Sequence, residues 1–149
     1  MHSRITAPLL AAAGLFFACG PRSQTVVGKA KSRTGADTTV AAHVSIDTTK
    51  GEVRFAIAVH NGTRKSVEIN FPDGRTHDFV VLDTAGREVW RWSEGRMFTQ
   101  SMQNRFVGSQ DSIIYDEKWR TAAPGNYTLV ALLNSENHPV RQQVPFALH

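Results

Sequence analysis

The chain has 149 residues, of which 41% are apolar and 20% are charged, and it carries a net charge of +4 at pH 7. This composition fits one globular domain with an appended segment and excludes both a disordered chain and a membrane-spanning protein. Lys and Arg are spread along the sequence rather than gathered in a stripe with interleaved aromatic residues, so we expect no nucleic-acid binding.

The first 18 residues have the pattern of an export signal. His2 and Arg4 precede an apolar run from Ala7 to Ala18, which is too short to cross a bilayer but has the length of a secretory hydrophobic region. We therefore predict a signal peptide over residues 1–18, and export of the protein.

The run ends at Cys19, the single cysteine of the chain. Leu15-Phe-Phe-Ala-Cys19 resembles the lipobox of bacterial lipoproteins, in which the cysteine receives a diacylglyceryl group. Since a lone cysteine forms no internal disulfide and acyl chains hold a protein at a membrane, we predict lipid attachment at Cys19. The protein would then be a membrane-anchored lipoprotein at the cell envelope. The alternative is an ordinary signal peptide followed by an incidental thiol.

Residues 19–37 are predicted to be a lipidated, flexible linker. The segment is polar, contains Arg22, Lys29, Lys31 and Arg33, and has no aromatic residue, so it buries too little apolar surface to order itself. A second interpretation is that these basic residues bind an anionic membrane surface.

From residue 38 to residue 149 the sequence alternates with a period of two. Val53, Phe55, Ile57 and Val59 are separated by polar or small residues, as in a strand with one face in a core. Turn signals containing Gly or Pro separate the apolar runs. The predicted strands are 43–47, 53–59, 67–71, 77–83, 88–93, 112–119, 126–134 and 140–148. About eight short strands predict an all-β sandwich or barrel.

The sequence also predicts two hairpins and allows one short helix. Asn61-Gly62 is typical of a hairpin turn and would join strands 53–59 and 67–71. A glycine turn at Gly86 would join 77–83 to 88–93. Residues 97–104 could form a turn or two of helix.

Trp90 and Trp92 stand two positions apart, so a strand would carry both indoles on one face. A sandwich of this size needs large inward side chains, which favours a core position for the pair. The alternative is a binding surface. Arg91 would lie on the opposite face, toward solvent.

Several motifs resemble the BsuPI-type intracellular proteinase inhibitor family. They are Asn61, Phe71-Pro-Asp-Gly-Arg-Thr-His-Asp-Phe79, Gly86-Arg-Glu-Val-Trp-Arg-Trp-Ser93, Phe98, Trp119 and Pro124-Gly-Asn-Tyr127, and the likeness covers roughly residues 44–133. The resemblance implies an immunoglobulin-like antiparallel β-sandwich and inhibition of a serine protease. The structural residues it implies are Asp78, Phe79, Trp90, Trp92, Phe98, Trp119 and Tyr127.

The chain departs from the family pattern at His77, where a Tyr is usual. It also departs at Val107-Gly-Ser-Gln-Asp111, which replaces a hydrophobic-x-Pro-Gly-Glu turn. The export signal is a third difference, because the family is named for a cytoplasmic target.

No catalytic, metal or cofactor site is predicted. Asp78 has the character of a buried carboxylate that accepts backbone N–H bonds. His77 and Asp78 are neighbours in a strand and point to opposite faces, so they cannot act as a base and its orienting acid. The six histidines form no pair at metal-ligand spacing.

We therefore expect a non-enzymatic binding module of the cell envelope that inhibits a proteinase through an exposed loop. The partner would be a serine protease or an envelope protein. The alternative is a structural or interaction domain for protein or polysaccharide, with no protease target. Two loops are candidates, Asn134 to Pro139 and the segment Ser93, Glu94, Gly95, Arg96 and Met97, in which Arg96 could fill a specificity pocket.

Overall fold

The computed structural model describes residues 26–28, 40–48, 52–120 and 122–149. The predicted signal peptide and Cys19 lie outside these ranges. The described residues form ten strands and no helix. The strands are β1 (Val26–Gly28), β2 (Val40–Asp47), β3 (Val53–Asn61), β4 (Val67–Phe71), β5 (His77–Leu82), β6 (Glu88–Arg91), β7 (Gln103–Val107), β8 (Ser112–Trp119), β9 (Gly125–Leu133) and β10 (Val140–Leu148).

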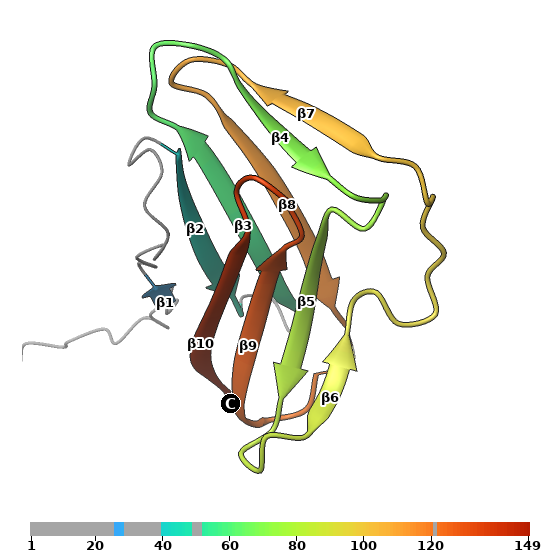
Figure 1. The fold of residues 1–149 in the computed structure, drawn as a ribbon. Helices are drawn as coiled ribbons and strands as arrows, with labels where there is room; N and C mark the ends of the chain where they lie inside the picture. The colour runs from blue at the N-terminus through green and yellow to red at the C-terminus, as the bar shows by residue number, and fades with distance from the viewer. Residues whose placement is uncertain (1–25, 29–39, 49–51, 121) are drawn as a thin grey trace, which may run out of the picture.

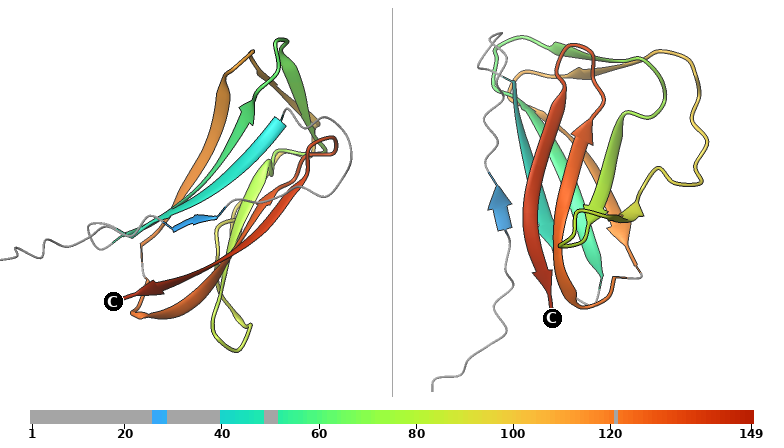
Figure 2. Two further views of the ribbon diagram at one scale, coloured as in Figure 1. Left: turned by 90° about the vertical axis from the view of Figure 1, so that its left-hand side faces the viewer. Right: turned by 60° about the horizontal axis from the view of Figure 1, so that its bottom comes forward.

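Two four-stranded antiparallel sheets face each other. One has the order β1-β2-β3-β8 and the other the order β10-β9-β5-β6, while β4 and β7 form a separate two-stranded sheet at one end (Figure 1). Figure 2 shows the two large layers from other sides, with β1 at the outer edge. The predicted immunoglobulin-like β-sandwich is thereby confirmed.

The core lies between these layers and follows from the alternation in the sequence. In β3 every second residue from Val53 to Asn61 is buried, and in β10 every second residue from Gln142 to Phe146. Phe55, Phe79 and Phe146 meet at the centre, with ring centroids 5.8 and 5.7 Å from that of Phe55. These aromatic contacts bind the two sheets together.

The predicted hairpin across Gly86 is present. β5 pairs with β6, Gly86 has a φ of 77°, and Asp83 accepts hydrogen bonds from the N–H groups of Ala85 and Arg87, both at 2.9 Å. The side chain of Asp83 thus replaces the main-chain partners that a tight turn leaves unpaired.

The hairpin predicted across Asn61-Gly62 is wrong. β3 pairs with β2 and β8, whereas β4 pairs with β7. Neither Asn61 nor Gly62 has a positive φ, so the turn that closes a two-residue hairpin is absent. Instead the buried Asn61 side-chain amide donates to the carbonyl oxygens of Lys65, Val107 and Gly108 at 2.8 to 2.9 Å. These bonds direct the chain after β3 out of its sheet and toward β7.

The helix predicted over residues 97–104 is also wrong, because residues 97–102 form no regular element and Gln103–Val107 form β7. Within the predicted linker, Val26–Gly28 pair with β2 as the edge strand β1. No described segment forms a helix that is long and apolar enough to cross a membrane.

Candidate functional site

Among the residues that the structure describes, the longest connection without regular secondary structure follows β6. We call residues 92–102 the β6–β7 loop, and Figure 1 shows it bulging away from both large sheets. It begins with a turn in which the N–H of Glu94 donates to the carbonyl of Arg91 and Gly95 has a φ of 69°. Glycine suits this position because a Cβ is disfavoured there. The loop contains the candidate segment 93–97.

The start of the loop is fixed by Asp78 on β5. Asp78 is 1% exposed, and its carboxylate accepts hydrogen bonds from the Ser93 hydroxyl at 2.6 Å and the Ser93 N–H at 3.2 Å. The N–H of Phe79 donates to it at 2.9 Å. A buried charge needs such donors, so Asp78 and Ser93 hold each other in place.

Arg91 completes the neutralisation of this carboxylate. Arg91 was expected to face solvent on the side opposite Trp90; its side chain is partly exposed and also bonds two carboxylates. Its Nη1 donates to Asp78 at 3.0 Å, while Nε and Nη2 form a fork on Glu88 at 2.9 and 2.6 Å. The hydrogen bonds to Glu88, and then to Asp78, raise the pKa of Arg91.

The middle of the loop is fixed on the indole of Trp92. The Arg96 guanidinium lies 4.7 Å from the centroid of the indole, and its Nε donates to the carbonyl of Trp92 at 2.8 Å. Phe98 packs on the same indole with the ring centroids 5.5 Å apart. Residues 96 and 98 are therefore both attached to Trp92.

The end of the loop is fixed by Gly74. The N–H of Gly74 donates to the carbonyl of Thr99 at 2.9 Å, and a Cβ on Gly74 would lie 2.7 Å from the Cγ2 of Thr99. Only a glycine permits this approach without movement of Thr99. The Pro72-Asp-Gly74 turn is thus a docking point for the loop.

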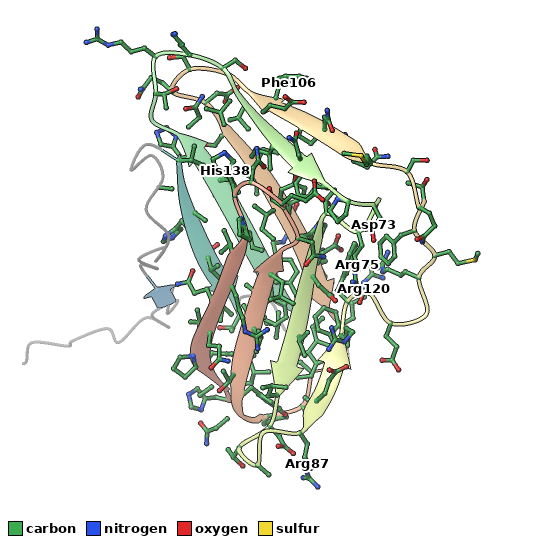
Figure 3. The ribbon with its side chains drawn as sticks, in the orientation of Figure 1. Asp73, Arg75, Arg87, Phe106, Arg120 and His138 are labelled. Atoms are coloured by element: carbon green, nitrogen blue, oxygen red, sulfur yellow. The ribbon has the colours of Figure 1, made fainter. Side chains whose placement is uncertain are left out.

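The loop and the strand after it expose large apolar side chains, with Met97 between the attachments and Met102 and Phe106 beyond the last one at Thr99. Met97 is 99% exposed and Met102 is 66% exposed, and Phe106 on the following strand is 71% exposed. Phe106 lies at the end of the molecule opposite the β5–β6 turn that carries Arg87 (Figure 3). The sequence reasoning missed Met102 and Phe106, because their segment shows no clear alternation.

His77 on β5 lies under the start of the loop, among two aromatic rings and one carboxylate. His77 stacks on Trp92 with ring centroids 4.2 Å apart and lies beside Tyr115 at 4.8 Å. Its Nε2 is 3.4 Å from Oε1 of Glu117, which is too long for a good hydrogen bond. Burial lowers the pKa of His77, and the nearby Glu117 carboxylate opposes that shift.

The two predicted tryptophans pack on the core from the edge of the sandwich. Trp90 lies 5.7 Å from Phe55 and 6.1 Å from Trp119, measured between ring centroids. Trp119 in turn meets Tyr127 edge-on at 5.2 Å. The Tyr127 hydroxyl donates to the carbonyl of Ala123 at 3.0 Å, which ties the start of β9 to the preceding turn. These contacts support a structural function for the aromatic motif residues.

The second candidate loop, Asn134 to Pro139, is occupied by internal contacts. The Asn134 side chain donates to the carbonyl of Arg75, and Asn137 bonds the main chain of Glu68 and Asn70. This loop clamps β4 to the second sheet. It is therefore a less suitable binding element than the β6–β7 loop.

Among the residues that the structure describes, no group of three or more His, Cys, Asp or Glu side chains converges as a metal site would. A shallow polar cleft of about 520 Å³ lies beside the loop, lined by Trp90, Arg96, Asp116, Glu117, Lys118 and Arg120. Of the charged groups there, Asp116 pairs with Arg54, Glu117 lies beside His77, and Lys118 pairs with Glu52 from outside the cleft.

Comparison with known proteins gives one informative match. No curated protein matches the chain. A solved structure that matches, a β-glucosidase from Erythrobacter marinus, has 11% sequence identity and a TM-score of 0.36 over 85% of this chain, which spans only 16% of that enzyme. This likeness is too weak to bear on function. Residues 40–138, by contrast, match the BsuPI family model, described as intracellular proteinase inhibitor. The chain belongs to the BsuPI intracellular proteinase inhibitor family.

Proposed function

We propose that this protein is a non-enzymatic inhibitor of a serine protease and that the β6–β7 loop enters the protease cleft. The observation that carries the proposal is a loop that is exposed at Met97 and attached to the scaffold at three points: Ser93 bonds Asp78, Trp92 stacks on His77 and holds Phe98, and Thr99 bonds Gly74. Family membership supports the inhibitory activity, and the geometry favours this loop over Asn134 to Pro139.

The attachment of the loop is important because a segment that must become ordered on binding lowers the affinity of an inhibitor for its protease. Each side chain or loop residue that becomes ordered on binding reduces the net affinity. In this protein the ends of the segment are already ordered by contacts with β5, β6 and the Pro72-Asp-Gly74 turn. Protease binding would therefore require little further ordering of the chain.

We also propose that the inhibitor is exported and held at the cell envelope by a lipid on Cys19. The apolar run before Cys19 and the lipobox-like residues support this placement. Its target would then be a protease of the envelope or of the surrounding medium, rather than a cytoplasmic enzyme.

The direct test is a titration of the full chain, purified in detergent, against subtilisin, chymotrypsin, elastase and trypsin. We expect slowed peptide hydrolysis by at least one of them at micromolar inhibitor. The variant Ser93→Ala, which removes the 2.6 Å hydrogen bond to Asp78, should inhibit less well, whereas Thr84→Ala in the exposed β5–β6 turn should inhibit as the wild type does. Absence of inhibition of every enzyme would reject the proposed function.

A further inference from the structure

The large apolar side chains that the structure exposes are not evenly distributed. Five are exposed in the described residues, and three of them, Met97, Met102 and Phe106, lie within ten consecutive positions. Single exposed apolar residues are ordinary on protein surfaces, but a concentration on one segment marks an interaction site. The segment is the β6–β7 loop and the strand that follows it.

We infer that Met97 is the residue that enters the specificity pocket of the target, and that the target is a serine endopeptidase whose pocket accepts a long apolar side chain. This inference rests on the proposed inhibitory function and names the class of partner. It replaces Arg96, which sequence reasoning selected for the same pocket.

The geometry around Trp92 determines the direction of Met97. Arg96 and Phe98, the residues on either side, both contact the indole, at 4.7 and 5.5 Å from its centroid. Both neighbours of Met97 therefore turn toward the indole, while Met97 itself makes no such contact. The 99% exposure of Met97 agrees with this arrangement.

Arg96 is unsuited to the pocket for the same reason. Its guanidinium lies over the indole and its Nε donates to the carbonyl of Trp92 at 2.8 Å. Insertion into a pocket would break both interactions and would release the loop from Trp92. Met97, in contrast, has no contact to lose and only apolar surface to bury.

The chemistry of Met97 selects the pocket. A protease pocket with a buried carboxylate recognises Arg or Lys, whereas an apolar slot accepts large uncharged side chains. The flexible, unbranched thioether adapts to an apolar slot of irregular shape. We therefore expect inhibition of subtilisin or chymotrypsin rather than trypsin.

Substitutions at position 97 test the inference on the full chain. Met97→Leu should inhibit the apolar-pocket enzyme nearly as well as the wild type, and Met97→Gly should raise its inhibition constant at least tenfold. Met97→Arg should weaken that inhibition similarly and raise affinity for trypsin at least tenfold. Ile114→Leu, at an exposed apolar position on β8 outside the loop, is the matched control and should behave as the wild type. The exposed positions allow all four variants to fold, which the melting temperature will verify.

Oxidation provides a second readout. Hydrogen peroxide converts an exposed methionine into a polar sulfoxide. We expect it to weaken inhibition by the wild type and by Ile114→Leu, and to leave Met97→Leu active. If Met97→Gly, Met97→Arg and the oxidised wild type all inhibit normally, the inference is wrong while the inhibitory function stands. If the wild type inhibits no protease, the proposed function fails and this inference with it.

Discussion

The Ser93 hydroxyl donates a 2.6 Å hydrogen bond to a carboxylate oxygen of Asp78, and this bond joins the start of the β6–β7 loop to β5, an inner strand of the second sheet. The same oxygen accepts a 3.0 Å bond from Arg91. The loop and the sheet therefore share one buried charge.

Replacement of that charge should destabilise the fold. We expect Asp78→Asn to lower the free energy of unfolding by about 2–3 kcal/mol, because it leaves Arg91 partly unpaired and puts an amide N–H against donors. Asp116→Asn is the matched control. Its ion pair with Arg54 is about half exposed, so the expected loss is below about 0.5 kcal/mol. Urea denaturation measures the free energy of unfolding of both variants. Equal losses would contradict the conclusion that the buried carboxylate of Asp78 stabilises the fold more than an exposed ion pair does.

The close approach of Gly74 to Thr99 predicts a paired effect. Gly74→Ala should cost about 1–3 kcal/mol of stability, because the new Cβ would meet the Cγ2 of Thr99 at 2.7 Å. It should also weaken protease inhibition by displacing the end of the loop. Thr99→Ser removes the obstructing methyl group, so the double variant should recover part of both losses. Lack of any recovery in the thermal melt would show that the clash is not the cause.

Gln110 has a φ of +59°, in the left-handed region that glycine adopts most readily. It lies in the segment Val107-Gly-Ser-Gln-Asp111, where the family pattern has a Pro-Gly-Glu turn, so a residue with a Cβ adopts this φ here. Both Gln110→Ala and Gln110→Gly remove the side-chain bond to the carbonyl of Gly62. We expect the Gly variant to be more stable than the Ala variant by about 1 kcal/mol in urea denaturation. The opposite order would mean that this φ is not retained in solution.

The pH dependence of stability should contain a contribution from His77. Burial lowers its folded pKa below the ordinary value of 6.5, so below about that pH the unfolded chain binds more protons than the folded one. Stability is then fully present above that pH and declines as the pH falls, by at most about 1.4 kcal/mol per pH unit for one proton. Glu117, Asp78 and Arg96 act on the same ring and remain in a His77→Tyr variant.

The measurement is the urea midpoint at pH 7.5 and at pH 5.5. We expect a smaller difference between the two midpoints in His77→Tyr than in the wild type. Identical differences would assign the pH dependence to other groups.

Anchoring by Cys19 is tested by phase separation of membranes in a detergent that clouds on warming. The wild type, expressed in a bacterial host, should enter the detergent phase, because acylation adds about 0.8 kcal/mol of membrane affinity per buried methylene. Cys19→Ala should move to the aqueous phase, and Ser23→Ala should partition as the wild type does. Recovery of the wild type in the aqueous phase would reject the anchor.

The strands were predictable where apolar residues alternate, but of the two predicted hairpin pairings only the one across Gly86 is present. The bounds of β4, β8 and β10 agree with the predicted ranges, since each has a regular pattern. β7 has adjacent Phe106 and Val107 and no alternation, so it is a strand only because β4 offers it an edge. Pairing across the Asn61-Gly62 turn failed for a related reason, since the Asn61 amide bonds carbonyl groups 46 and 47 residues away.

The candidate loop was located from the sequence, but its attachments were not. Segment 93–97 was chosen because it was expected to be accessible after the strand that carries Trp90 and Trp92. The contacts of Gly74 with Thr99, and of Asp78 with Ser93, join residues 25 and 15 positions apart. No local pattern predicts such contacts. The bond of Arg96 to the Trp92 carbonyl is local, but it depends on the turn at Gly95, which the sequence analysis did not predict.

Ser93, Phe98 and Thr99 attach the loop to the sandwich, and other residues of the loop are free to contact a target. Met97 and residues 100–102 are exposed and add nothing that fixes the loop to either sheet, so substitutions there should alter the choice of target without weakening the scaffold. The domain thus has a stable sandwich and a loop tip whose residues can change without affecting it. The tip is therefore a starting point for selecting variants against different hydrolases. Relatives could diverge in target by the same route while keeping one architecture.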